Sequence, residues 1–408
     1  MASTLPDNPS LDHLRAEART LQREVAVAAP DAVDAVRRHH PRAELALTKD
    51  RFALHDAQLV VARRYGFSGW SALAQYLRAA AALSVDPARF DERAMSGPDR
   101  FCALAVLRYT DDDAPPRWAS AARMLSAEPG LADAHVWAAA AAGDPDALAR
   151  HLTQCEDVNA AGGPFGWAPL LYLCYSRVDV HRTADQLLTA ATLLLDAGAD
   201  PNAGYLWRGM STPFTALTGA FGEGEQGARR QPRHPHCSEL AALLLRRGAH
   251  PVDQQSLYNR MFRPDNSHLE LLFAHGLADA APSPWERRLG GAMESRAQMW
   301  RRQVDWAAAH GFAERLDLLA RHGVDVAGAQ VRMAELPDDV NALDQDGATA
   351  LHHAAWSGDI GLIRRLLDAG ADPSVTDRRF DATPQGWAQY AYQTEAADLL
   401  GAVTEPRS

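Results

Sequence analysis

The sequence predicts an all-α fold made of stacked helix-turn-helix units, and three features support this. Leucine-rich segments with apolar residues at three- and four-residue spacing recur along the chain, as in amphipathic helices. Many of them end in a glycine and a short polar turn, which commonly closes a helix. The chain has 408 residues, which exceeds the usual size of one compact core but suits an open-ended array.

The composition is that of a chain that folds around a core and is repelled by polyanions. Hydrophobic residues make up 47% of the sequence, and the formal net charge is −11. Negative charge of this size disfavours association with DNA and with anionic membranes. We therefore expect neither nucleic acid nor a membrane as a partner.

The cysteines and the N-terminal sequence predict a cytoplasmic protein. The four cysteines lie far apart, which suits neither a disulfide framework nor a zinc ribbon; they are Cys102, Cys155, Cys174 and Cys237. The first residues lack the basic segment and apolar run of a signal peptide. No uncharged apolar run reaches the roughly 18 residues that a membrane-spanning helix needs.

The clearest repeated unit covers residues 340–376 and reads VNALDQDGATALHHAAWSGDIGLIRRLLDAGADPSVT. Thr349 can cap a first helix through its hydroxyl, and Ala354 and Ala355 allow a second helix to approach closely. Leucine and isoleucine between positions 362 and 367 form one apolar face of that second helix. Gly370 falls where a left-handed residue would end it.

This unit resembles the ankyrin repeat, whose pattern is a turn, T-P-L-H-x-A-A, a glycine, a second helix ending in L-L, and G-A-D-x-N. The chain has T-A-L-H-H-A-A from residue 349, glycine at 358, L-L at 366 and G-A-D-P at 370, and it restarts with Thr383 and Pro384. Weaker copies of the second-helix end occur at residues 193–203, 243–253, 269–277 and 318–326. The resemblance implies an ankyrin-repeat solenoid of about seven helix-turn-helix units over residues 96–404.

Two insertions interrupt the repeat period. Residues 222–237 are rich in glycine, proline and charge, which predicts a mobile loop. Residues 278–302 add helical sequence beyond the repeat. Insertions of this kind map to loops on one face of a solenoid, sometimes the binding face.

Residues 1–95 lack the repeat signature. Their apolar spacing predicts helices over residues 11–28, 31–39, 54–65 and 71–83, with Ser10 as the cap of the first. We expect this N-terminal helical extension to cover the apolar face of the first repeat, as terminal caps do. A separate binding module is the alternative.

The sequence carries no familiar catalytic pattern, neither a nucleophile elbow, a phosphate loop, a zinc-protease helix nor a dinucleotide fingerprint. His234, His236 and Cys237 lie close together, but no second ligand pair has zinc-finger spacing. The acidic runs at 111–113 and 338–339 fall in turns rather than in the dry pocket that a catalytic carboxylate pair needs. We therefore expect no enzyme activity, no cofactor and no metal.

The resemblance implies that the turn tips and the exposed sides of the first helices contact a protein partner. Matching positions here are rich in Trp, Tyr and Arg, the residue types that dominate binding interfaces. The candidate contact residues are Phe165, Trp167, Tyr175, Tyr205, Trp207, Arg208, Gln345, Asp346, Trp356, Arg379, Phe380 and Tyr390.

Two functions are therefore open. The first is a non-catalytic scaffold, a monomer that binds a protein partner through its concave surface. The alternative is a small-ligand or enzyme-like function in residues 1–95 or 278–302. A pocket lined by convergent polar groups in either segment would favour the alternative.

Gly370→Val tests the repeat assignment. A β-branched residue resists the left-handed conformation that this helix end requires, so we expect a loss of more than about 1 kcal/mol in the free energy of unfolding. Thermal unfolding measures it. An unchanged midpoint would mean that the helix does not end at this glycine.

Overall fold

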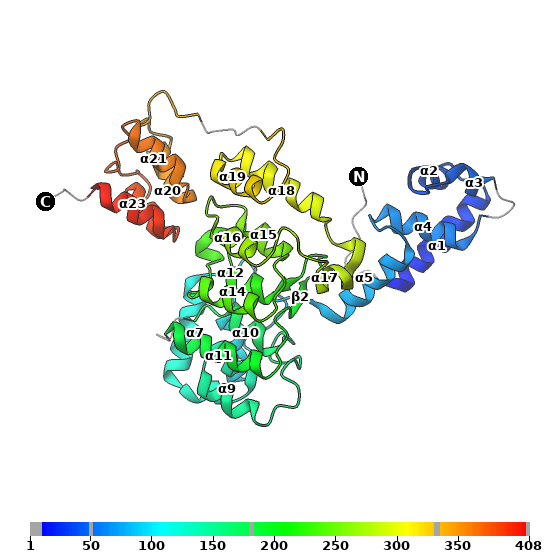
Figure 1. Ribbon diagram of the computed structural model, residues 1–408, viewed down its shortest axis with the longest axis horizontal. Helices are drawn as coiled ribbons and strands as arrows, with labels where there is room; N and C mark the ends of the chain where they lie inside the picture. Colours follow the sequence, from blue (N-terminus) through cyan, green and yellow to red (C-terminus); the bar gives the residue numbers. More distant parts are fainter. Residues whose placement is uncertain (1–9, 49–51, 179–182, 330–334, 405–408) are drawn as a thin grey trace. The chain divides into compact units, whose positions relative to one another are not determined.

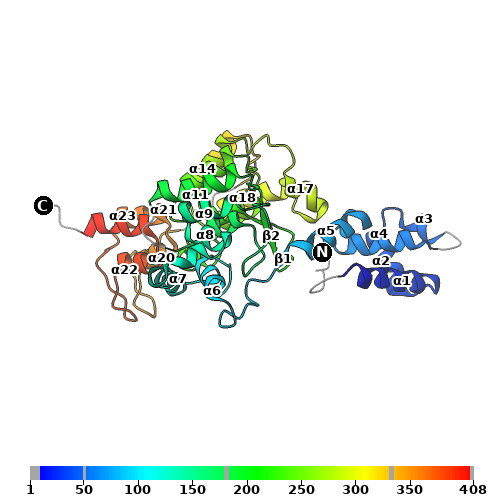
Figure 2. The same ribbon diagram turned by 90° about the horizontal axis from the view of Figure 1, so that it is seen from below.

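The computed structural model describes residues 10–48, 52–178, 183–329 and 335–404, and it is mostly helical, as the sequence predicts (Figures 1 and 2). The chain divides into two compact units. We call residues 1–86, 205–214 and 281–298 the N-terminal unit, and residues 87–204, 215–280 and 299–408 the array unit.

The N-terminal unit begins with a run of helices: α1 (Leu11–Ala26), α2 (Pro30–His39), α3 (Ala43–Leu47), α4 (Leu54–Arg64) and α5 (Trp70–Leu83). The four helices expected in this region correspond to α1, α2, α4 and α5. Ser10 caps α1 as expected, because its hydroxyl accepts a hydrogen bond from the amide of His13 at 3.1 Å. Leu14, Val60 and Leu73 are buried in the shared core.

Two segments from much later in the sequence complete this unit. Strand β1 (Ser84–Val85) pairs in parallel with β2 (Gly204–Trp207), with Ser84 opposite Leu206, and β3 (Phe214–Thr215) completes a sheet in the order β1-β2-β3. Helix α17 (Pro284–Leu289) and the 3-10 helix η2 (Gly290–Ala292) pack on α5. Trp285 and Leu289 join the core that contains Leu73. Much of the second insertion therefore belongs to the N-terminal unit.

The array unit is a succession of helix pairs in the part of the chain that the structure describes. The pairs are α6 (Gly97–Ala105) with α7 (Pro115–Ala127), α8 (Val136–Ala142) with α9 (Pro145–Leu152), α10 (Pro169–Tyr175) with α11 (Ala184–Asp196), α12 (Ala216–Phe221) with α14 (Cys237–Arg246), α15 (Gln254–Arg260) with α16 (Ser267–Ala274), α18 (Arg296–Ala309) with α19 (Ala313–Arg321), α20 (Ala350–Ser357) with α21 (Ile360–Asp368), and α22 (Pro384–Tyr390) with α23 (Thr394–Thr404). Two short helices, η1 (Pro129–Asp133) and α13 (Gly227–Arg230), lie in connections. First helices pack on first helices, as α8 on α10 and α20 on α22, and second helices pack on second helices, as α9 on α11.

Asparagine side chains join the turns of neighbouring pairs. The amide of Asn341 donates to the carbonyl of Gly370 at 3.1 Å, and its oxygen accepts from the amide of Asp372 at 2.8 Å. The same two bonds, at 2.7–3.0 Å, link Asn159 to the turn at 198–200 and Asn202 to the turn at 248–250. Gly370 has a φ of 90°, the left-handed conformation that the sequence predicts there.

Residues 222–237 do not form the mobile loop that their composition predicts. Glu223, Gln231 and His234 are buried. Gly222 allows two backbone segments to pack closely, because a Cβ atom at this position would lie 2.3 Å from the carbonyl oxygen of Pro232. The segment packs tightly because its polar groups find partners within the array unit.

Trp285→Ala tests whether the late segments hold the N-terminal unit together. Removing a buried indole leaves a cavity and costs about 3–5 kcal/mol, so we expect faster amide hydrogen exchange throughout α1, α4 and α5. Trp300→Ala is the matched control, since Trp300 stacks on Phe273 in the array unit. Equal protection of α1, α4 and α5 in both variants would contradict the assignment of α17 to this core.

Candidate functional site

An exposed group of aromatic side chains lies on the last two first helices of the array unit. Trp356 is the penultimate residue of α20, Tyr390 ends α22, and Phe380 lies in the turn before α22. Their side chains are 46%, 56% and 62% exposed, respectively. Together with the half-buried Trp387 they form what we call the aromatic patch.

The rings of the aromatic patch contact one another. The ring of Trp356 stacks on that of Tyr390 with centroids 5.9 Å apart, and meets Trp387 edge-on at 5.9 Å. Phe380 meets Trp387 edge-on at 6.2 Å. These offset and T-shaped arrangements suit the charge distribution of aromatic rings. The rings therefore form one surface held in a fixed arrangement.

The buried carboxylate of Asp377 holds the turn that carries Phe380. It accepts hydrogen bonds from the amides of Phe380 at 2.7 Å and Ala382 at 3.1 Å. It also accepts from the indole Nε1 of Trp387 at 2.8 Å. Burial by itself would raise the pKa of Asp377, but the bonds from Trp387 and the backbone outweigh it and lower the pKa to about 2.

His352 anchors the start of α20 beneath the patch. Its Nδ1 accepts from the amide of Thr349 at 3.0 Å, so its Nε2 carries the proton and donates to the carbonyl of Ala382 at 3.1 Å. Burial lowers the pKa of His352, which keeps the ring neutral for this pair of bonds. His352 therefore has a structural role within the repeat.

Two guanidinium groups border the patch. Arg379 lies 5.1 Å from the ring centroid of Phe380, and Arg229 lies 4.0 Å from that of Tyr390. Gln345 and Asp346 are exposed in the preceding turn. A surface of aromatic rings with flanking arginines is typical of protein-binding sites.

Other candidate contact residues are in the interior. Phe165, Trp167 and Tyr175 are buried, with the ring of Trp167 at 4.9 Å from Phe165 and 5.3 Å from Tyr175. They pack between helices and present no surface to a partner in this conformation. The isolated bridge between Gly162 and Trp167 turns this segment inward.

The three candidates of the long turn after Asn202 belong to the N-terminal unit. Tyr205 is buried and Trp207 is half-buried. Arg208 is exposed, lies 4.5 Å from the ring centroid of Trp207, and pairs with Asp86 at 2.9 Å. These side chains serve packing within that unit.

Trp387 is a member of the aromatic patch that the sequence analysis did not include among its candidates. Trp387 lies four residues after Thr383, just as His353 lies four residues after Thr349 in the preceding repeat. Aligning the two first helices would have identified it, because the same register places Tyr390 opposite Trp356. The exposed Tyr392 adjoins this group and was also missed.

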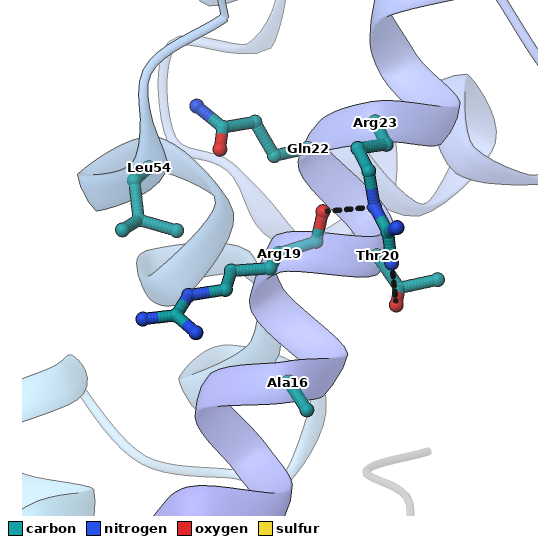
Figure 3. Close-up of a pocket in the computed structure, with 6 residues that line it drawn as sticks. All are labelled: Ala16, Arg19, Thr20, Gln22, Arg23 and Leu54. Carbon is teal, nitrogen blue, oxygen red and sulfur yellow. Dashed lines mark hydrogen bonds between the residues drawn. The ribbon is translucent and has the colours of Figure 1, made fainter.

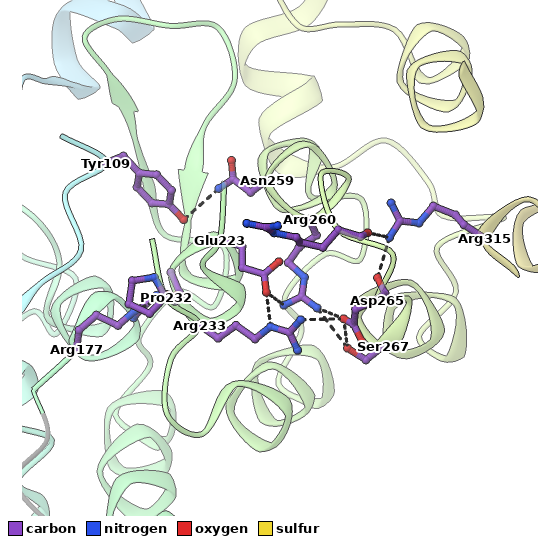
Figure 4. Close-up of polar contacts among 12 residues, drawn as sticks. Tyr109, Arg177, Glu223, Pro232, Arg233, Asn259, Arg260, Asp265, Ser267 and Arg315 are labelled. Atoms are coloured by element: carbon purple, nitrogen blue, oxygen red, sulfur yellow. Dashed lines mark hydrogen bonds and ion pairs between the residues drawn. The ribbon is translucent and has the colours of Figure 1, made fainter. Parts of the chain in front are cut away.

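A buried polar network lies elsewhere in the array unit (Figure 4). Glu223 forms ion pairs with Arg233 at 2.5 Å and with Arg260 at 3.5 Å. Asp265 forms ion pairs with the same two arginines, with Arg233 at 3.2 Å. Arg315 donates to the carbonyls of residues 261, 263 and 265 at 2.5–2.9 Å. Two carboxylates and a group of helix-end carbonyls thus offset the arginines, which identifies the network as a structural one.

A depression opens on the N-terminal unit, between α1 and the start of α4 (Figure 3). It encloses about 540 Å³ and is lined by Ala16, Arg19, Thr20, Gln22, Arg23 and Leu54. The described lining residues include no carboxylate, imidazole or thiol, the groups that acid–base and nucleophilic catalysis use most. The lining is polar, as the small-ligand alternative requires, but it lacks the side chains that catalysis uses most.

Searches for other kinds of site add three findings. No group of three His, Cys, Asp or Glu residues is placed to hold a metal ion within the described ranges. No described helix has both the length and the apolar character needed to cross a membrane. All four cysteines are free, with Cys102 and Cys174 buried.

Comparison with known proteins identifies one family. A sequence profile for ankyrin repeats, in three copies, matches residues 304–377. The matched segment covers the end of α18 and all of α19, α20 and α21, and it ends at Asp377. A search of the curated proteins gives no match.

Asp377→Asn should loosen the aromatic patch. The charge-assisted bonds are lost, at a cost of about 1–2 kcal/mol in the free energy of unfolding. The pKa is lower in the folded chain than in the unfolded one, so the carboxylate stabilises the fold above about pH 4 and stops doing so as the pH falls toward 2. Unfolding midpoints measured from pH 7 to 2 should show this loss in the wild type and lack that component in the variant. Parallel curves for the two proteins would refute the role of Asp377.

Proposed function

Because the chain carries ankyrin repeats over residues 304–377, we propose that it is a non-catalytic binding module that holds a protein partner on the aromatic patch. Ankyrin repeats are generally protein-interaction modules. The proposal specifies the surface, namely the side of α20 and α22 that carries Trp356, Trp387 and Tyr390, with Phe380 and Arg379 from the turn.

The single observation that carries the proposal is the exposure of three large aromatic side chains in one connected group. Trp356, Phe380 and Tyr390 are each close to half exposed or more, although the core directly beneath them is complete. Leaving such rings in water costs free energy that a covering surface would recover. Tyr and Trp also lose little conformational entropy on binding, because few bonds in them rotate.

The charged residues around the aromatic patch favour specific binding of one partner over non-specific binding. Arg379 offers a planar guanidinium beside Phe380, and Asp346 offers a carboxylate in the neighbouring turn. Charges of both signs at the rim select a partner with complementary charges and reject others. Gln345 adds neutral donors and acceptors at the same edge.

The proposal also extends the ankyrin architecture back from residue 304 toward residue 96. It is supported by the bonds of Asn159 and Asn202, which have the geometry that Asn341 has within the matched region. The described helix pairs before residue 304 pack first helix on first helix in the same way. About seven or eight units would then form the solenoid, with the N-terminal unit as its extension.

We place this module in the cytoplasm as a monomer. Four free thiols, two of them buried, suit a reducing compartment. The proposal includes no catalytic step and no cofactor, in keeping with the lack of a catalytic sequence pattern.

A capture experiment tests the proposal. Full-length protein is used to retain partners from its source cytosol, and compared with Trp356→Ala/Phe380→Ala. Two anchor residues cost about 1–2 kcal/mol or more each at a binding hot spot, so at least a tenfold loss of the retained protein is expected. Photo-crosslinking from position 390 should join that same protein to the patch.

Met210→Ala is the control, since Met210 is similarly exposed but belongs to the N-terminal unit. It should retain the partner fully, and circular dichroism should find both variants folded. A partner that binds the double variant as tightly as the wild type would rule out the aromatic patch as its site.

A further inference from the structure

The two units differ in charge although they belong to one acidic chain. The N-terminal unit holds 15 of the 41 Lys and Arg residues and 12 of the 52 Asp and Glu residues, which leaves 26 and 40 for the array unit. The N-terminal unit is therefore net positive and the array unit strongly negative. An acidic ligand would therefore be repelled less by the N-terminal unit than by the array unit.

The depression of Figure 3 is where this positive charge meets a concave surface. Arg19 and Arg23 lie one turn apart on α1 and both line it, and none of the lining residues that the structure describes is a carboxylate. Figure 3 shows Arg19 extending across the depression toward the helix that carries Leu54, while Arg23 turns back along α1. Arg23 donates to Thr20 Oγ1 at 3.0 Å, so its guanidinium is held in place with donors left over.

The carboxylates of α1 are mostly engaged on other faces of the helix. Glu17 accepts from the hydroxyl of Tyr65 at 2.9 Å and pairs with Arg64 at 3.3 Å. Asp12 pairs with Arg15 at 2.8 Å. Arg19 has no ion-pair partner among the residues that the structure describes. Because no described carboxylate pairs with Arg19, its charge is available to a bound ligand.

The remaining lining suits a peptide. Ala16 and Leu54 supply apolar contact, and Thr20 supplies a hydroxyl beside the guanidinium groups. A volume of about 540 Å³ holds a few side chains. Arginine binds carboxylates in a planar, two-point geometry. Single-stranded nucleic acid is commonly held by aromatic rings that stack on its bases, and none of the described lining residues is aromatic.

From this charge complementarity we propose that the depression between α1 and α4 binds an acidic peptide segment of a protein partner, with Arg19 and Arg23 holding its carboxylates. This is a second interaction surface, separate from the aromatic patch. With both surfaces, one chain could bind an acidic segment in the depression and a second surface on the aromatic patch. The two could belong to one partner or to two.

The test measures binding of a fluorescently labelled octaglutamate peptide to the full-length protein by anisotropy at low salt. Arg19→Glu/Arg23→Glu should raise the Kd at least tenfold. Arg78→Glu is the matched control, an exposed arginine on α5 outside the depression, and single Arg19→Glu should lie between the two. Surface changes of this kind leave stability within about 0.5 kcal/mol, which thermal unfolding checks.

Each outcome bears on the proposal. A selective loss in the double variant, with Arg78→Glu within twofold of wild type, supports it. Equal weakening by Arg78→Glu would mean a general charge effect and overturn it, as would the absence of any binding. Displacement of the peptide by inorganic phosphate at an equal concentration of charge would overturn it in favour of a small-anion site.

The same experiment separates this proposal from the function of the aromatic patch. Trp356→Ala/Phe380→Ala should bind octaglutamate as the wild type does, because neither residue lies in the N-terminal unit. Failure of one proposal therefore leaves the other untouched.

Discussion

The bond between an asparagine side chain and the glycine turn of the next helix pair sets the spacing on which the array unit depends. At Asn159, Asn202 and Asn341 the side-chain amide satisfies a carbonyl at a helix end and an amide two residues later. Both are backbone groups that the helix itself leaves unpaired. Because one side chain serves two turns, neighbouring pairs stay in register even where the connections between them differ in length.

The long connections between helices also contain backbone carbonyl groups that need hydrogen-bond donors, and buried arginines supply these donors. Arg117 donates to the carbonyls of residues 103, 104 and 106 at the end of α6. Arg177 donates to the carbonyls of residues 174, 176, 219 and 232. Arg315 donates to the carbonyls of residues 261, 263 and 265 in the connection after α15. Burial lowers the pKa of Arg177 but leaves the guanidinium charged. A planar cation with five donors can pair with several carbonyl groups at once, which helps the irregular connections to pack.

The aromatic patch follows from these constraints. Helices α20 and α22 bury Leu351 and Ala388 against a core of their own, and the same register turns Trp356 and Tyr390 outward. Asp377 and His352 then fix the intervening turn through charged and neutral hydrogen bonds. The binding surface is thus the outer side of a rigid element, which lowers the entropy that a partner must overcome.

The sequence by itself determined the helical class, the N-terminal helices and the glycine-ended turns, since these depend on local spacing. It also pointed to the exposed candidates Trp356, Phe380 and Tyr390, through the repeat pattern of residues 340–376 and its restart at Thr383. Only the tertiary structure decided that Phe165, Trp167 and Tyr175 are interior, that residues 222–237 are packed, and that the segment containing Trp285 completes a distant core. The reason is physical: an aromatic ring suits a core and an interface equally well, and a glycine-rich segment suits a free loop and a close contact equally well. What distinguishes them is the surface that packs opposite, which comes from residues far away in the sequence.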